Sequence, residues 1–163
     1  DLVCVEPRIL AYYKPSKMSS GVSVNDNCAK VFNEIKLQHA YRYIIYALTP
    51  DLRQIDVLKT APTTATFDEF VADLKEAEEA GECRYAVFDA EFNLNDGQKR
   101  TKLVFFLWSP ERAKIKQKMV YTSSKDYLKH KLVGIAKVVQ ACDDSDLSWS
   151  NVLEVCLRSE YAQ

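Results

Sequence analysis

Side chains that commonly carry catalysis are sparse in this 163-residue chain. The two histidines, His39 and His130, are not part of a G-x-S-x-G or H-E-x-x-H motif. The four glycines are scattered between residues 21 and 134, which excludes a glycine-rich nucleotide loop. Asp89 and Glu91 would share one face of a strand, but a solvated strand edge explains them more simply. We therefore expect no catalytic residue and no cofactor, with an unrecognised enzyme site kept as an alternative.

The five cysteines do not suggest a metal or disulfide site. They are widely scattered, odd in number and without a C-x-x-C pair, so we expect reduced thiols and no metal ligands. Cys28 and Cys156 fall on apolar helical stripes, where a free cysteine behaves as a small buried hydrophobe.

Basic residues are concentrated in one segment, between residues 114 and 131, whereas acids gather at residues 73–82 and 143–146. Because the whole chain has 22 basic and 23 acidic residues, a net charge of -1, no general attraction to nucleic acid or anionic membranes is expected. Such a segregated charge pattern favours an acidic protein partner. The lysines of the segment are Lys114, Lys116, Lys118, Lys125, Lys129 and Lys131.

The length and composition indicate one folded domain, since no linker-like segment interrupts the chain. Residues 1–17 show no helical or strand period and lack the features of a signal peptide, so we interpret them as a leader or extension outside the domain. The domain is then expected to span residues 18–163. The apolar run at residues 103–108 is far shorter than the roughly 20 residues of a membrane-spanning helix.

The first half of the domain predicts helix, two strands and helix. Apolar residues from 24 to 35 recur at helical spacing, and Ser23 with Asp26 three residues later suggests an N-cap. Residues 41–46 and 54–59 are typical of strands. Thr66 should cap a helix over residues 67–75, followed by an acidic surface stretch that ends at Gly81.

The second half predicts a long β-hairpin and more helix. Residues 84–92 and 101–108 are two strands joined through Asn95-Asp96-Gly97, a strong turn signal. Ser109 and Pro110 are typical of a helix start, so a helix of about four turns should begin there. Residues 130–141 favour a strand, and Ser148 should cap a final helix.

The predicted fold class is therefore α/β (α+β), a central mixed sheet of five to six strands with helices on both faces. The strand at residues 103–108 is apolar on both faces, which requires a helical layer on each side.

Three segments closely resemble the ADF/cofilin family. Residues 108–126, WSPERAKIKQKMVYTSSKD, are similar to its long-helix signature, residues 82–89, ECRYAVFD, to its third strand, and residues 18–22, MSSGV, to its start. The resemblance extends from residue 18 to about residue 158. It implies a single ADF-homology domain that binds actin monomers and filaments and promotes filament severing and depolymerisation.

The resemblance also implies the residues of several sites. For binding of both monomers and filaments they are Ser20, Gly21, Lys116, Lys118, Met119 and Ser124. A filament-specific site would comprise Arg100, Lys102, Glu154 and Arg158, although Val155 departs from the basic residue that relatives can carry. Ser20 resembles the regulatory phosphorylation site. The phosphoinositide-responsive surface would comprise Lys116, Lys118, Lys125, Lys129 and Lys131.

The helix geometry raises one question about Lys116 and Lys118. On an ideal helix they lie about 100° and about 60° to opposite sides of Ile115. Either the helix is deeply buried in the partner, or only one lysine is central.

The remaining expectations concern partners and location. We expect a monomeric protein of the cytoplasm and cytoskeleton, with a nuclear pool as a further expectation. A coactosin-like protein that only binds filament sides is the alternative within the same fold, but it should lack the basic pair on the helix.

Overall fold

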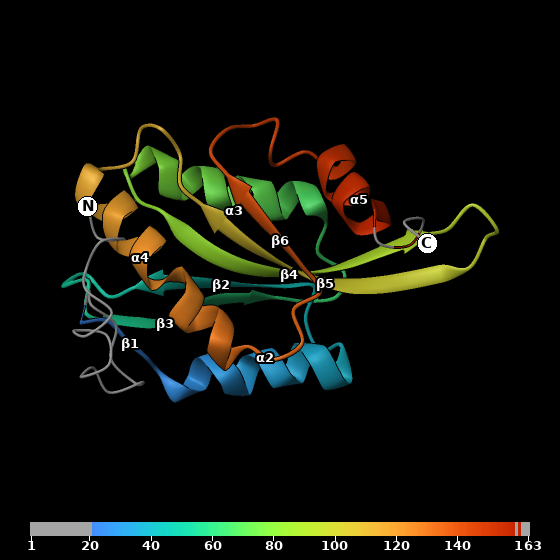
Figure 1. Cartoon of the computed structure of the whole chain (residues 1–163), viewed down its shortest axis with the longest axis horizontal. Coiled ribbons are helices and arrows are strands. Elements are labelled where there is room, and N and C mark those ends of the chain that lie inside the picture. The colour runs from blue at the N-terminus through green and yellow to red at the C-terminus, as the bar shows by residue number, and fades with distance from the viewer. Residues whose placement is uncertain (1–20, 159, 161–163) are drawn as a thin grey trace, which may run out of the picture.

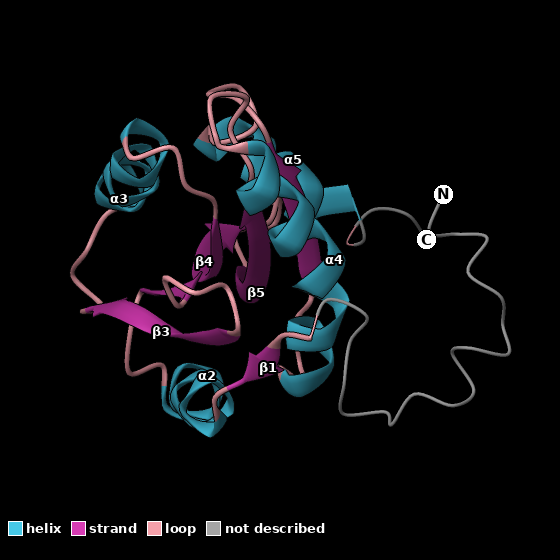
Figure 2. Cartoon of the chain, turned by 90° about the vertical axis from the view of Figure 1, so that its left-hand side faces the viewer, coloured by secondary structure: helices cyan, strands magenta, loops and turns pink. Residues whose placement is uncertain are grey.

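The computed structural model describes residues 21–158 and residue 160. The expected leader, residues 1–17, and Ser20 lie outside the described residues. Six strands form one sheet in the order β1-β3-β2-β4-β5-β6, with four described helices around it (Figures 1 and 2). In chain order the elements are β1 Ser23–Val24, α2 Asp26–Gln38, β2 Tyr43–Leu48, β3 Gln54–Ala61, α3 Phe67–Glu79, β4 Arg84–Asn93, β5 Lys99–Trp108, α4 Ile115–Lys131, β6 Lys137–Ala141 and α5 Trp149–Arg158.

The sheet is mixed, as predicted. β1 pairs with β3 and β6 with β5 in parallel, whereas the three inner pairings are antiparallel. The β4–β5 hairpin has an unbroken register from Arg84↔Trp108 to Asn93↔Lys99, and Figure 1 shows it extending beyond the helices. This projection carries the first residues of β5 away from the main body of the domain.

Two apolar cores lie on the two faces of the sheet. Alternate residues of β2 point to opposite sides, so that Ile44 and Tyr46 face α2 and α4 whereas Tyr43 and Ile45 face α3 and α5. Residues 103–108 are buried throughout, which confirms the expected central strand. The Trp108 indole Nε1 donates a hydrogen bond to the Leu74 carbonyl at 2.8 Å and so fixes α3 against β5.

The first helix begins later than predicted. Ser23 and Val24 form β1 against Gln54 and Ile55 of β3, so Ser23 is not the N-cap. Asn25 caps α2 instead, because its side-chain oxygen accepts a hydrogen bond from the Asn27 amide at 2.8 Å.

Helix α3 also differs from its prediction at one end. Thr66 caps it, as expected, and also forms a complete capping box with Glu69. The acidic stretch predicted to follow the helix is in fact its last turn, since α3 continues to Glu79. Gly81, with a φ of +74°, follows the C-cap residue Ala80.

The prediction that a helix begins at Ser109 is wrong. The Ser109 amide donates to the Ala141 carbonyl at 2.9 Å, which continues the pairing of β5 with β6. Lys114 is extended, with φ -62° and ψ 143°, and its amide donates to the Gly81 carbonyl. These contacts with neighbouring segments delay α4 until Ile115.

The strand expected at residues 130–141 is shorter in the structure. Helix α4 continues to Lys131, and β6 begins only at Lys137. The final helix follows the prediction: Ser148 Oγ accepts a hydrogen bond from the Asn151 amide at 3.1 Å at the start of α5.

Candidate functional site

Helix α4 is held against the sheet by one buried face. Tyr121, Ser124 and Leu128 on this face are fully or almost fully buried. The Tyr121 hydroxyl accepts a hydrogen bond from the Leu48 amide at 2.9 Å, and the Tyr121 carbonyl accepts one from the Tyr85 hydroxyl. These bonds fix the rotation of α4 and therefore which residues it presents to solvent.

The opposite face of α4 combines exposed apolar and basic side chains. Ile115 is 76% exposed and Met119 is 62% exposed, which is unusual for large apolar residues. Lys116 is exposed on one edge of this apolar pair, and Lys118 lies on the other edge, half-buried. Lys118 Nζ donates to the Glu111 carbonyl at 2.7 Å, which ties the lysine to the preceding loop.

Ile115 was absent from the predicted site residues, although its position gives a signal. It stands four residues before Met119, and neither belongs to the stripe that packs on the sheet. An apolar pair on the polar side of a helix indicates a contact with another molecule.

Ser124 does not belong to this exposed face. Its side chain is 0% exposed, so the expectation that it lies at a contact position is wrong for direct contact. On an ideal helix Ser124 lies about 180° from Ile115, which explains its burial.

The N-terminal part of the expected site is only partly described. Gly21 is exposed, with a φ of +74° that favours glycine, and Val22 next to it is buried in the core. The described part of the chain therefore begins at an exposed residue and enters the core at Val22.

The five lysines of the expected phosphoinositide surface do not share one face of α4. On an ideal helix Lys118, Lys125 and Lys129 lie within about 40° of one another, whereas Lys116 and Lys131 lie on the other side. Lys125 Nζ is 3.5 Å from the side-chain oxygen of Gln140 on β6, and Lys131 Nζ stands 5.6 Å from the centre of the Tyr127 ring. Helix geometry thus divides the set into a group of three and a group of two.

The four residues of the expected filament-specific site come from the hairpin and from α5, which lies beside it (Figure 1). Arg158 and Glu154 form an ion pair on α5 at 3.2 Å. Lys102 is only 16% exposed, because its Nζ contacts the Cys156 carbonyl at 3.3 Å and the Glu160 carboxylate at 2.9 Å. Glu160 was not predicted, and nothing in its sequence position indicated this contact.

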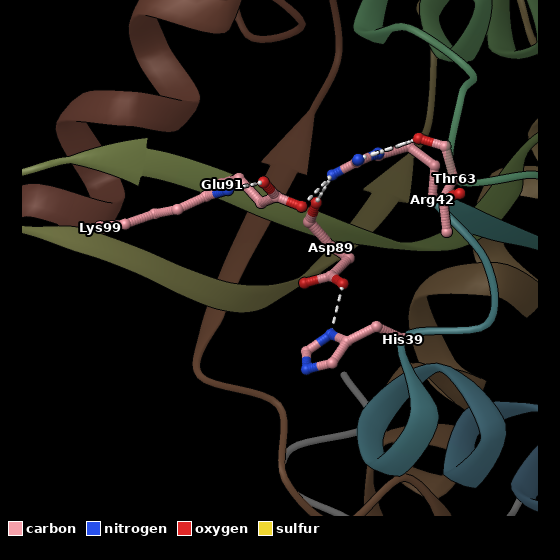
Figure 3. A network of polar contacts seen from close by, with 6 residues as sticks. All are labelled: His39, Arg42, Thr63, Asp89, Glu91 and Lys99. Atoms are coloured by element: carbon pink, nitrogen blue, oxygen red, sulfur yellow. Dashed lines mark hydrogen bonds and ion pairs between the residues drawn. The ribbon is translucent and has the colours of Figure 1, made fainter.

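The carboxylates Asp89 and Glu91 form a structural network rather than a solvated edge (Figure 3). Asp89 is 3% exposed, and its Oδ2 lies 2.9 Å from His39 Nδ1. Lys99, followed by Arg42, holds the pKa of Glu91 below its usual range. Since Arg42 also donates to the Thr63 carbonyl, the network joins the base of the hairpin to the β3–α3 loop.

Three other groups with strongly shifted pKa values lie in the packed core. Burial raises the pKa of Cys28 to about 12 and raises the pKa values of Tyr46 and Tyr85, as a packed core does. Cys28 and Cys156 are both fully buried, as expected. Within residues 21–158 and 160, no three His, Cys, Asp or Glu side chains are grouped to hold a metal ion.

The described helices include none with the length and apolar character needed to cross a membrane. The outward face of α4 thus presents an apolar centre with basic edges on a helix that is fixed to the sheet.

Comparison with known proteins identifies the family. The model of the family described as cofilin/tropomyosin-type actin-binding protein matches residues 21–157. Cofilin of Mycosarcoma maydis is 44% identical over 88% of this chain and 100% of its own length, and actophorin of Acanthamoeba castellanii is 43% identical over 83% and 94%. The crystal structure of Streptomyces griseoflavus cofilin, 42% identical, matches with a TM-score of 0.74 over 82% of this chain and 96% of that chain.

This chain belongs to the ADF/cofilin family of actin-binding proteins. The expected fold class and the family resemblance are thereby confirmed.

Proposed function

We propose that the chain binds actin monomers and filaments and promotes filament severing and depolymerisation, by binding and without catalysis. The observation that carries this proposal is the outward face of α4, where exposed Ile115 and Met119 lie between Lys116 and Lys118. Lysine ammonium groups can pair with an acidic actin surface while the helix supplies rigid apolar contact. We further propose that the protein acts as a monomer in the cytoplasm, associated with the cytoskeleton, with a nuclear pool.

Sedimentation with actin filaments, a fluorescence assay with actin monomers and microscopy of filament length test this function together. We expect binding in both assays and shorter filaments. A protein that pellets with filaments but neither binds monomers nor shortens filaments would instead be a side-binding protein of the same fold. Absence of binding in both assays would contradict the proposal.

We propose that Arg100, Lys102, Glu154 and Arg158 form a second contact used only on filaments. Their location on the hairpin and on adjacent α5 supports one continuous surface. In the free protein Lys102 also holds the two elements together, because its Nζ contacts the Cys156 carbonyl and the Glu160 carboxylate. Val155 adds no charge, so this contact should be weaker than one with a basic residue there.

We propose that phosphorylation of Ser20 inhibits actin binding. A phosphate adds about -1.5 to -2 charges next to Gly21, where they would repel an acidic partner. Ser20→Glu is expected to weaken monomer binding by about fivefold, whereas Ser20→Ala should bind like wild type. Titration of labelled actin monomers measures both. Wild-type affinity and depolymerising activity in Ser20→Glu would show that this serine is not a switch.

We propose that phosphoinositides bind to the lysines of α4, and that Lys118, Lys125 and Lys129 contribute most because they share one side of the helix. Lys125→Ala/Lys129→Ala should weaken binding to vesicles containing phosphatidylinositol bisphosphate by about 1 kcal/mol for each lysine. Lys30→Ala/Lys59→Ala removes the same charge from α2 and β3 and should have a smaller effect. Equal losses in the two double variants would mean that only net charge matters.

A further inference from the structure

The basic start of β5 is covered by an acid from the segment after α5. Glu160 Oε1 is 2.9 Å from Lys102 Nζ, and Glu160 Oε2 is 3.9 Å from Arg100 Nε. The Glu160 side chain is 21% exposed, which shows that it lies against the protein. One carboxylate therefore faces both basic residues that the hairpin contributes to the proposed filament contact.

The backbone helps to hold Glu160 in this position. Its amide donates to the Leu157 carbonyl at 3.0 Å, which turns the chain back at the end of α5. Lys102 Nζ also contacts the Cys156 carbonyl at 3.3 Å, where the free carbonyls of a helix C-terminus attract a cation. The contact thus joins the last turn of α5 to β5 through three groups.

The positive charge around Glu160 extends the pH range over which its carboxylate stays ionised. Lys102, followed by Arg100 and Lys137, holds the pKa of the Glu160 carboxyl below its usual range. Because this pKa is lowered, the contact is complete above the ordinary carboxyl range and is lost only as the pH falls through the lowered value. The remaining cation of the proposed surface, Arg158, is paired with Glu154.

From these contacts we infer that Glu160 determines the balance between filament and monomer binding, because it competes with an acidic filament surface for Arg100 and Lys102. An acidic partner must displace the carboxylate before it can approach the two basic side chains. The face of α4 that is proposed to bind monomers does not include Glu160 or its two basic partners. Monomer binding therefore does not require the Glu160 carboxylate to be displaced. This inference rests on the proposed function and names a control on its filament-specific site.

Glu160→Gln keeps the size of the side chain and removes its charge. Filament affinity at low salt is expected to rise by about two- to fivefold, whereas monomer affinity should stay within about twofold of wild type. The gain should shrink at high ionic strength, since the side chains are partly exposed. Sedimentation with filaments at two salt concentrations and titration of labelled monomers measure these affinities.

The matched control is Glu79→Gln, which makes the same change of net charge at the exposed end of α3. It should alter neither affinity. An equal gain in both variants would assign the effect to net charge and overturn the inference. Unchanged or weaker filament binding by Glu160→Gln, with normal binding by wild type, would overturn the inference and leave the proposed function intact.

The contact can also be tested without actin. Carboxyl NMR titration of wild type should place the Glu160 pKa below the usual range, and Lys102→Met should raise it. An ordinary pKa that does not respond to Lys102→Met would show that the carboxylate does not face this lysine. If neither wild type nor Glu160→Gln binds filaments, the proposed function and the inference both fail.

Discussion

Changing Lys116 and Lys118 together to alanine is expected to weaken binding to both actin monomers and actin filaments by about tenfold or more. Truncating one partner of a desolvated charge pair costs about 2–5 kcal/mol, and losing rim charges costs less. We expect a loss larger than that of two rim charges and smaller than that of two desolvated charges, because Lys116 is exposed and Lys118 is half-buried in the free protein. Filament sedimentation and monomer titration measure the affinities.

The variant must remain folded for this result to be informative. Neither lysine belongs to the apolar cores, so its unfolding midpoint in urea should be close to that of wild type. Lys30→Ala/Lys59→Ala removes the same number of charges from α2 and β3 and should bind actin almost normally. Undiminished binding by the Lys116→Ala/Lys118→Ala protein would remove α4 as the proposed contact.

The single variants address how deeply α4 enters the partner. Because the two lysines lie on opposite edges of the outward face, comparable losses from each would mean that the partner encloses both edges. A loss from only one would mean a tangential contact. Met119→Ala should also weaken actin binding. Met119 is 62% exposed in the free protein, so its removal takes apolar area away from the proposed contact.

Much of the sheet could be predicted because its sequence signals are local. The Asn95-Asp96-Gly97 turn and the two flanking β-rich runs specify the hairpin, and the register in the structure is unbroken. The run at residues 103–108, which is apolar on both faces of the strand, correctly indicated that both faces of the sheet are covered by helices. These features depend on short-range turn chemistry and on alternation along a strand.

The errors at helix ends arose where distant segments compete with local preference. Ser109 and Pro110 have the residue types of a helix start, but the Ser109 amide bonds to the Ala141 carbonyl, 32 residues later in the chain. Ser23 likewise pairs with β3 instead of capping α2. Hydrogen bonds with remote partners are not visible in a local pattern, and here they decide where the helices begin.

The candidate site likewise combines residues that the sequence indicated with features that depend on contacts between distant segments. The family resemblance indicated Lys116, Lys118 and Met119, and the structure places all three on the side of α4 that faces away from the sheet. The resemblance did not reveal that Ser124 is buried, nor that Glu160 reaches across to β5. The first fact depends on the rotation of α4 on the sheet, and the second depends on how the chain turns after α5.

Tyr121→Phe is expected to lower the free energy of unfolding by about 1–3 kcal/mol. The change removes one oxygen and leaves the Leu48 amide without its acceptor in a buried position. The ring stays, so the packing of α4 against Tyr85 should be largely preserved. Urea unfolding, followed by circular dichroism, measures the loss.

Tyr85→Phe is the matched control, because it also removes one buried hydroxyl from the same pair of rings. Its hydroxyl donates to the Tyr121 carbonyl, which keeps its bond within α4, so less than about 1 kcal/mol should be lost. An equal or larger loss in Tyr85→Phe would contradict the role given to the Leu48 amide. Folded Tyr121→Phe should still bind actin, whereas Lys116→Ala/Lys118→Ala should fold normally and bind poorly. These opposite outcomes are expected from one helix whose buried face sets its position and whose exposed face is the proposed contact.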